Sequence, residues 1–366
     1  MANDFTLNPD RPVTTKDQDL FGRYPLASQL ALRIGGWAGD SALVVGVMGE
    51  WGSGKSSFVE FVCQELRQNT ENVAIIEFNA WMFTGLHDLL SRFFTTLATQ
   101  LGSSLPGGKH KELFAKLETI GEGLNIVGFL PGFAPFKMLG ALIKGPNKAA
   151  RELQANLEIA KEHLKATLVE QDKTLVIVID DIDRLTDDEI RQVFQLVKLT
   201  GNFARTVYLL AFDEGAVAAA LQSQYGSSFL DKVVQVPVQL PQASATALRD
   251  YVFEAIGKVT YAYGFDWPDA VDGDFGGVLR QLYDIWPLRR VRVPRDAIRL
   301  ANALSVSFPL VKDDVNIADF LLLEMLRIWE SDVYGSVASC RRHLVNRDPY
   351  SNERDTKSVL QRWLPD

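Results

Sequence analysis

The sequence contains little cysteine and no excess of basic charge. Its 366 residues include two cysteines, Cys63 and Cys340, which lie far apart in the chain and indicate a reducing compartment without a disulfide framework. The formal net charge of −8 argues against a general nucleic-acid coat, because such a protein needs a basic field to displace counterions from phosphates. A local basic site is still open. A composition of 47% hydrophobic and 23% charged residues is ordinary for a globular protein with a buried core.

The sequence also lacks a long uninterrupted apolar run. The most apolar stretch, residues 126–143, is interrupted by Pro131, Pro135, Lys137 and three glycines. A lysine and two prolines disfavour a single membrane-spanning helix, so we expect no membrane contact and favour a buried or partner-facing segment. The N-terminus lacks the basic start and apolar core of a signal peptide, so we expect a cytoplasmic protein.

The sequence does contain the pattern G-x-x-x-x-G-K-[ST], a Walker A motif, at residues 49–56. The motif lies between an apolar run, 42–48, and a helix-like run, 57–67. Glycines let the backbone curl so that its N–H groups face a phosphate at the start of a helix. Lys55 is expected to reach the β- and γ-phosphates, and the Ser56 hydroxyl to hold Mg²⁺. The residues predicted to bind ATP in this loop are Gly49, Glu50, Trp51, Gly52, Ser53, Gly54, Lys55, Ser56 and Ser57.

A second phosphate-handling element, a Walker B motif, is predicted at residues 175–181. Its continuous β-branched run is typical of a central parallel strand, and this strand ends in Asp180 and Asp181. Asp180 is placed to hold Mg²⁺, usually through water, and Asp181 to polarise the attacking water as a general base. Aspartate is one methylene shorter than the glutamate common at this position, so slow turnover is expected.

Three further strands are predicted at residues 73–78, 207–212 and 233–240. The second of them ends at Asp213, which could sense the γ-phosphate or orient water, or could cap the helix that starts near Glu214. Both roles stay open. Helices are predicted at residues 19–37, 86–101, 147–170, 187–199, 244–262, 274–285, 293–306 and 317–331.

Five arginines form the single basic concentration of the sequence. They are Arg289, Arg290, Arg292, Arg295 and Arg299. They could be a solvated, ion-paired start of a helix, or Arg295 or Arg299 could close over the nucleotide, because a guanidinium can bridge two phosphate oxygens. Nucleic-acid contact is a third alternative, although the aromatic residues that favour single-strand binding are missing here.

No metal other than the nucleotide's Mg²⁺ is indicated. The sequence has no H-E-x-x-H and no C-x-x-C motif, and its four histidines lie at no ligand-like spacing. They are His87, His110, His163 and His343.

The ordered motifs of the chain resemble the KAP family of P-loop NTPases, which includes phage-exclusion proteins and an animal membrane scaffold. The resemblance covers about residues 19–329. It rests on the phosphate loop together with Phe78–Trp81, Asp180–Arg184, Ala211–Asp213, Val233–Pro237, Val293–Arg295 and Arg299–Asn302.

The resemblance implies an α/β fold with a P-loop NTPase parallel sheet of the additional-strand type, flanked by helices. In such a sheet the strand that ends in Asp213 separates the phosphate-loop strand from the Asp180 strand. The expected domains are residues 1–240, a core with a helical insertion at about 82–172, and residues 241–366, a helical lid region. Many relatives carry a transmembrane pair where residues 126–143 stand, so a soluble member is favoured. Relatives often continue beyond the point that corresponds to Asp366, which is compatible with a truncated or a short form.

Two functions are open at this point. The first is a Mg²⁺-dependent ATPase in which Asp181 activates water and an arginine of a neighbouring subunit, Arg184 or Arg205, stabilises charge. The second is a nucleotide-gated scaffold with incidental turnover. The resemblance implies a role in defence against phage, a homo-oligomer and a separate protein effector. No guanine-selecting motif is evident, which mildly favours ATP.

Overall fold

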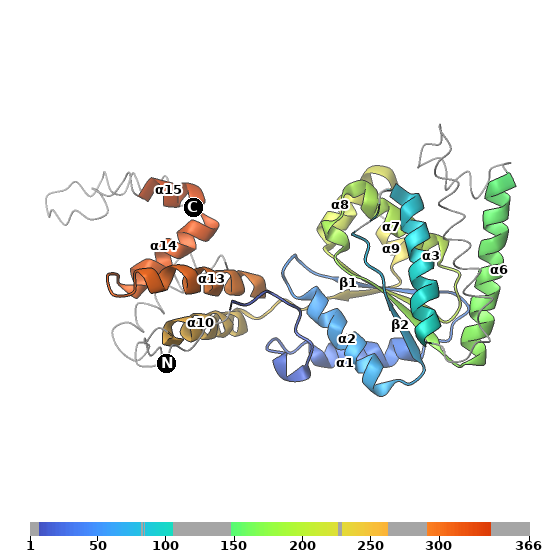
Figure 1. Ribbon diagram of the computed structural model, residues 1–366, viewed down its shortest axis with the longest axis horizontal. Coiled ribbons are helices and arrows are strands. Elements are labelled where there is room, and N and C mark those ends of the chain that lie inside the picture. The colour runs from blue at the N-terminus through green and yellow to red at the C-terminus, as the bar shows by residue number, and fades with distance from the viewer. Residues whose placement is uncertain are drawn as a thin grey trace. The chain divides into compact units, whose positions relative to one another are not determined.

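The computed structural model describes residues 7–81, 83, 85–104, 148–225, 229–262 and 291–337 (Figure 1). It divides into two compact units. The larger unit is Pro12–Gln242, and the smaller unit combines Met1–Arg11 with Ala243–Asp366. This division lies two residues after the boundary predicted from the sequence, and it groups the first 11 residues with the C-terminal region.

The larger unit is built on a five-stranded sheet in which all strands are parallel. The strand order is β2-β3-β4-β1-β5, so β4 lies between β1 and β3 as the additional-strand type requires. This part of the prediction is confirmed. The strands are β1 (Leu43–Met48), β2 (Val73–Glu77), β3 (Thr174–Ile179), β4 (Thr206–Phe212) and β5 (Val236–Gln239).

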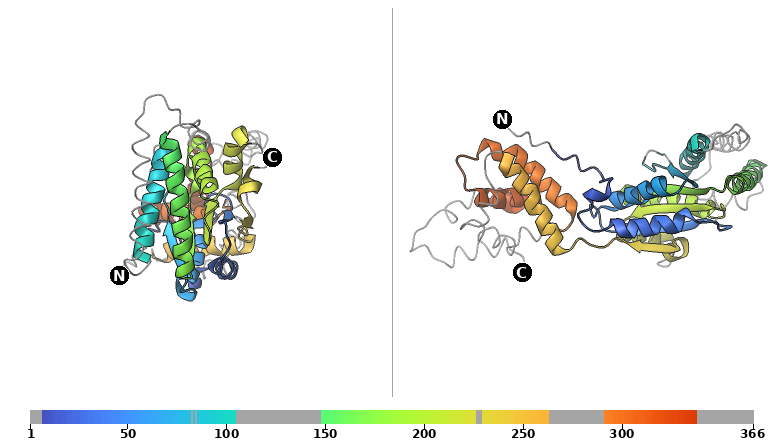
Figure 2. Two further views of the ribbon diagram at one scale, coloured as in Figure 1. Left: turned by 90° about the vertical axis from the view of Figure 1, so that its right-hand side faces the viewer. Right: turned by 90° about the horizontal axis from the view of Figure 1, so that it is seen from below.

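Helices cover both faces of this sheet (Figure 2). Strand side chains alternate between two cores, so that in β3 Ile177 packs on one face and Val176 on the other. All six residues of β3 are buried, which explains why every residue after Thr174 is apolar. The helices α1 (Tyr24–Gly35) and α2 (Lys55–Asn69) pack on one face. The other face is covered by α3 (Gly85–Ser104), α6 (Lys148–Glu170), α7 (Asp187–Leu199), α8 (Glu214–Tyr225) and α9 (Phe229–Val233).

One predicted strand is shorter than expected. The prediction extends over 233–240, but Val233 is the last residue of α9 and β5 begins at Val236. Val233 and Val234 are both buried in the core, at the end of α9 and directly after it. The periodicity of such a short apolar run does not distinguish the end of a helix from a strand. The predicted helix at residues 187–199 is confirmed, and the Thr186 side chain caps it by accepting a hydrogen bond from the Glu189 N–H.

Some predictions lie outside the described residues. They are the apolar segment 126–143, the helix 274–285 and residues 105–147 of the helical insertion, of which α3 and α6 are described. Among the residues that the structure describes, no helix is both long and apolar enough to cross a bilayer.

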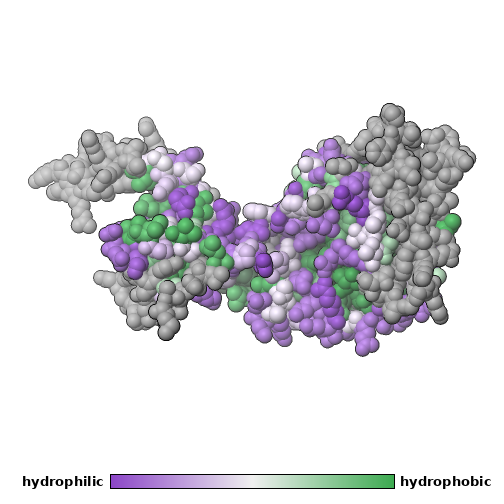
Figure 3. Space-filling model, viewed as in Figure 1, coloured by the Kyte–Doolittle hydropathy of each residue, from purple (hydrophilic) through white to green (hydrophobic). Residues whose placement is uncertain are grey.

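The smaller unit is helical. It comprises α10 (Ala245–Ala262), α13 (Pro294–Ser307), α14 (Ile317–Trp329) and α15 (Ser331–Val337), and residues such as Val252, Leu300 and Leu321 form its core. The N-terminal segment joins this unit through Asn8, whose N–H donates to the Asn302 side chain over 2.9 Å. Figure 3 shows hydrophobic residues at the surface of this unit, where Leu310 is exposed.

Candidate functional site

The phosphate loop leaves β1 at Met48, as predicted, and enters α2 at Lys55, two residues before the predicted helix-like run 57–67 begins. Gly52 and Gly54 have φ angles of +79° and +96°, a region that favours glycine because other residues are strained there. The Gly49 N–H donates to the Phe212 carbonyl of β4 over 3.3 Å, which ties the loop to the neighbouring strand. The curled backbone therefore stands at the N-terminus of a 15-residue helix, the arrangement that binds phosphates.

Gly54→Ala is expected to destabilise this loop. A Cβ at residue 54 would stand 2.6 Å from Nη1 of Arg23 and would also be held at an unfavourable φ. We expect a loss of about 1–2 kcal/mol in the free energy of unfolding, measured with denaturant. Gly36→Ala is the matched control, because Gly36 has a φ of −93° and a Cβ there would meet nothing within 4 Å. An equal effect of the two changes would contradict the strain argument.

Lys55 is held inside its own loop. Its side chain is 6% exposed, and its ammonium donates to the carbonyls of Gly49 (2.9 Å) and Glu50 (3.3 Å). Its Nζ lies 3.7 Å from Oδ2 of Asp183, whose side chain is 4% exposed. The ammonium thus stands at the start of α2, where a bound polyphosphate would meet it.

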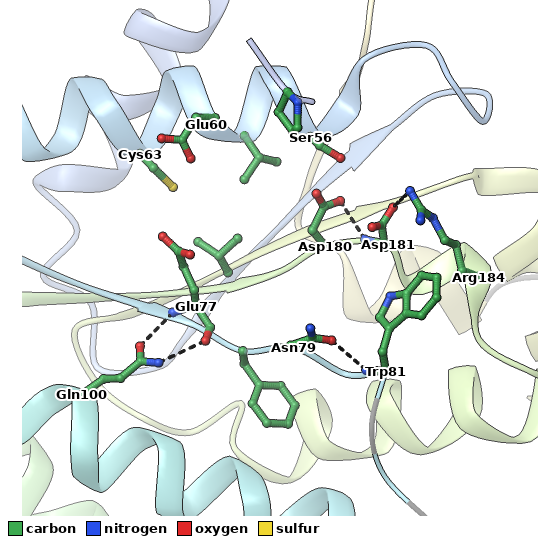
Figure 4. Close-up of a pocket in the computed structure, with 14 residues that line it drawn as sticks. Ser56, Glu60, Cys63, Glu77, Asn79, Trp81, Gln100, Asp180, Asp181 and Arg184 are labelled. Carbon is green, nitrogen blue, oxygen red and sulfur yellow. Dashed lines mark hydrogen bonds and ion pairs between the residues drawn. The ribbon is translucent and has the colours of Figure 1, made fainter. Parts of the chain in front are cut away.

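The two predicted magnesium ligands lie in one pocket of about 580 Å³. Ser56 comes from α2 and Asp180 from the end of β3, and Figure 4 shows their side chains pointing toward each other. A hydroxyl and a carboxylate are hard oxygen ligands that suit Mg²⁺, which usually takes few protein ligands and completes its shell with phosphates and water. Among the described residues, no group of three or more histidine, cysteine or acidic side chains could hold a metal ion.

Asp181 follows Asp180 in the left-handed region, with a φ of +57°. Its N–H donates to Oδ1 of Asp180 over 2.7 Å, and its carboxylate is ion-paired with Arg184 over 2.9 Å. Burial and the adjacent Asp180 raise the pKa of Asp181, and Arg184 opposes this increase. A carboxylate with a raised pKa is a better base near neutral pH, which fits the predicted role.

Arg184 lies in the pocket of its own chain. Its guanidinium stands 5.0 Å from the centre of the Trp81 ring, and both residues line the pocket with Asn79 (Figure 4). The side-chain oxygen of Asn79 accepts the Trp81 N–H over 2.9 Å, which holds this turn after β2. The sequence predicts that Arg184 acts on a neighbouring subunit. In the structure, Arg184 contacts Asp181 and Trp81 of its own chain.

Arg205 lies at the opposite edge of the sheet. It precedes β4, whereas the phosphate loop follows the C-terminal end of the parallel strand β1. Its Nε donates to the Lys173 carbonyl over 2.9 Å and its Nη2 is 2.6 Å from Asp172. These contacts join the N-terminal ends of β3 and β4, so Arg205 does not belong to the pocket of its own chain. A role at a neighbouring subunit stays a prediction.

Asp213 has the capping role that the sequence leaves open. Its Oδ1 accepts the N–H groups of Gly215 (2.9 Å) and Ala216 (3.2 Å) at the start of α8. A sensing role stays a prediction, although Phe212, the residue before Asp213, accepts a hydrogen bond from the Gly49 N–H of the loop.

The predicted lid arginines lie in the smaller unit. Arg295 and Arg299 both belong to α13, and Arg295 is ion-paired with Asp10. Arg289 and Arg290 lie outside the described residues. Contact of Arg295 or Arg299 with a nucleotide stays a prediction.

Sequence reasoning did not predict two residues of the site, Arg23 and Asp183. Arg23, 4% exposed, donates to the carbonyls of Ser53 and Pro241, and its buried Nε has no hydrogen-bond partner among the described residues. No sequence pattern marks a buried arginine of this kind. Asp183 carries a signal, because it is the third acidic residue in four positions, but spacing alone does not show that it turns back to Lys55.

Cys63 also lines the pocket. Its side chain is 1% exposed, and burial raises the pKa of its thiol to about 12. It is therefore protonated and unreactive at neutral pH, and we assign it a packing role on α2.

Most of this chain matches a curated relative. A curated relative, the phage T7 exclusion protein of Escherichia coli (strain K12), is 22% identical over an aligned length of 358 residues, and the match covers 89% of this chain and 46% of that protein. The chain therefore spans about half the length of this relative.

Solved structures with some similarity include Cdc6p of Pyrobaculum aerophilum, with 16% identity, a TM-score of 0.37 and coverage of 67% of this chain and 52% of that one. Another is the Aeropyrum pernix ORC2 protein in ADPNP–ADP complexes, with 11% identity, a TM-score of 0.40 and coverage of 98% and 87%. The fold is assigned from the strand order of this chain itself.

A family model described as the KAP family P-loop domain matches residues 23–311. The matched residues include the phosphate loop, the Asp180–Asp181 pair and α13. The chain therefore belongs to the KAP family of P-loop domains.

Proposed function

We propose that this protein is a Mg²⁺-dependent ATPase. The observation that carries the proposal is the meeting of Ser56, Asp180 and Asp181 in one pocket at the C-terminal edge of the sheet. The buried Ser53 Oγ, which has no hydrogen-bond partner among the described residues, also fits a loop that awaits a phosphate.

Each residue of the site has a separate proposed role in hydrolysis. The loop N–H groups and Lys55 bind the phosphates, and Ser56 and Asp180 would hold Mg²⁺, which when bound neutralises charge on the phosphate oxygens. The Asp181 carboxylate would accept the proton of the water that attacks the γ-phosphate, as the bond between this phosphate and ADP breaks. Arg184 holds the Asp181 carboxylate in place through its ion pair.

A nucleotide-gated scaffold is the second candidate. The ion pair between Asp181 and Arg184 favours it, because a carboxylate engaged by a guanidinium is a weaker base. In a scaffold, ATP stabilises one conformation or an oligomer and hydrolysis contributes little.

We further propose a homo-oligomer that works with a separate protein effector in defence against phage. The proposal is supported by family membership and by the printed name of the 22% identical relative, a phage T7 exclusion protein. Deletion of the gene should raise the plating efficiency of a restricted phage, and unchanged plating would contradict the defence role.

The test of the ATPase proposal is phosphate release per protomer across a range of protein concentrations, with ATP and GTP compared. Turnover per protomer that rises with concentration supports a site completed between subunits. Turnover that is constant supports an ATPase that is complete in one chain. Nucleotide binding without turnover at any concentration would favour the scaffold.

A further inference from the structure

Asp183 is a buried carboxylate with few partners. It belongs to η3 (Ile182–Arg184), the short turn that follows Asp181, and its side chain is 4% exposed. Its Oδ2 faces the Lys55 ammonium at 3.7 Å, and its Oδ1 is buried without a hydrogen-bond partner among the described residues. A carboxylate in such surroundings depends strongly on the cation near it.

The contact between Asp183 and Lys55 is Coulombic. A separation of 3.7 Å is too long for a direct hydrogen bond, and the hydrogen bonds of Lys55 go to the Gly49 and Glu50 carbonyls. Lys55 keeps these contacts while its ammonium stays within the loop. When the ammonium turns to phosphate oxygens, its contacts with Asp183 and with the two carbonyls weaken. The Asp183 carboxylate and the phosphate then compete for the same cation.

The local backbone places Asp183 there. The left-handed φ of Asp181 ends the strand and turns the chain, so that η3 returns toward the start of α2. The same turn carries Arg184, which is ion-paired with Asp181 and stacks on Trp81. A displacement of Asp183 would therefore also move Arg184, which lines the pocket.

We propose that Asp183 is the counter-ion that holds Lys55 in the empty phosphate loop and competes for it with the phosphates of an incoming nucleotide. Asp183 is thus a positioning residue that weakens nucleotide binding. Because coupling between sites is reciprocal, a bound nucleotide weakens the Asp183–Lys55 pair by the same factor. The inference rests on the proposed nucleotide binding.

The test compares the affinity of wild type and Asp183→Asn for ADP without Mg²⁺, by titration calorimetry. The amide has the shape of the carboxylate but lacks its charge, so we expect a dissociation constant lower by about tenfold. Asp187→Asn is the matched control, because it removes the same charge four residues later from a side chain that is 71% exposed. Its affinity should equal that of wild type.

An unchanged or weaker affinity of Asp183→Asn would overturn the inference, and a weaker one would mean that Asp183 supports the bound nucleotide. Wild type that binds no ADP would overturn the proposed function together with the inference. Asp183→Ser, which also removes the charge, serves if the asparagine variant does not unfold cooperatively, and it should tighten binding as well. A double-mutant cycle with Lys55→Met, read by unfolding without nucleotide, should show coupling between the two residues, and its absence would overturn the proposal.

Discussion

Lys55→Ala is expected to weaken nucleotide binding by on the order of 100-fold and to abolish turnover. Lys55 is the cation at the head of α2, and the loss of charged hydrogen bonds to phosphate costs about 3 kcal/mol. The change also leaves Asp183 buried without its counter-ion, so the free energy of unfolding should fall by roughly 3 kcal/mol. Both quantities are measurable, by ADP titration and by denaturant unfolding.

The double variant Lys55→Ala/Asp183→Asn separates these two effects. Removal of both partners takes away the unpaired charge, so we expect stability to recover while nucleotide binding stays weak. Recovery of binding in the double variant would show that Lys55 acts through stability alone. Turnover by Lys55→Ala at the wild-type rate would show that the measured activity belongs to another protein in the preparation.

Asp181→Asn is expected to lower turnover by about 10²–10⁴-fold while the affinity for ATP changes little. An asparagine cannot accept the proton of water, but Ser56, Asp180 and the loop, which are proposed to hold the nucleotide and its Mg²⁺, are unchanged. Asp188→Asn is the control, since its side chain lies on α7 and is 74% exposed. Turnover of Asp181→Asn within a few-fold of wild type would place the base elsewhere. A scaffold would keep its biological output in this variant, whereas output that depends on hydrolysis would stop.

The raised pKa of Asp181 gives this prediction a pH dependence. Burial and Asp180 disfavour the charged form in the folded protein. Below the ordinary aspartate pKa the carboxyl is protonated in both the folded and the unfolded state, so Asp181 costs no stability there. The loss of stability grows as pH rises from the ordinary value to the raised folded value and is complete above it. Asp181→Asn should therefore be more resistant to denaturant than wild type at pH 7, and the difference should shrink in acid. The acidic limb of the turnover profile should likewise lie above the ordinary aspartate range.

Much of the core follows from local patterns. A strand buried on both faces needs an apolar residue at every position, and β1, β3 and β4 show such runs in the sequence. The phosphate loop is equally local, because the glycines at 52 and 54 supply the conformations that the curl requires. A short apolar run does not distinguish the end of a helix from the start of a strand. For this reason the predicted start of β5, at residue 233, is wrong.

The sequence by itself determined the fold class and the glycine-rich phosphate loop, and it predicted the magnesium ligands and the candidate base, whose roles stay predictions. These features depend on residues that are adjacent in the chain or that end neighbouring parallel strands, so local chemistry and one topological rule suffice. The tertiary structure alone decided that Asp183 faces Lys55, that Arg23 holds the loop through Ser53, that Arg184 joins its own pocket and that Arg205 lies at the other edge. The physical reason is that a long or turned side chain finds its partner through packing across elements, which spacing along the chain does not encode.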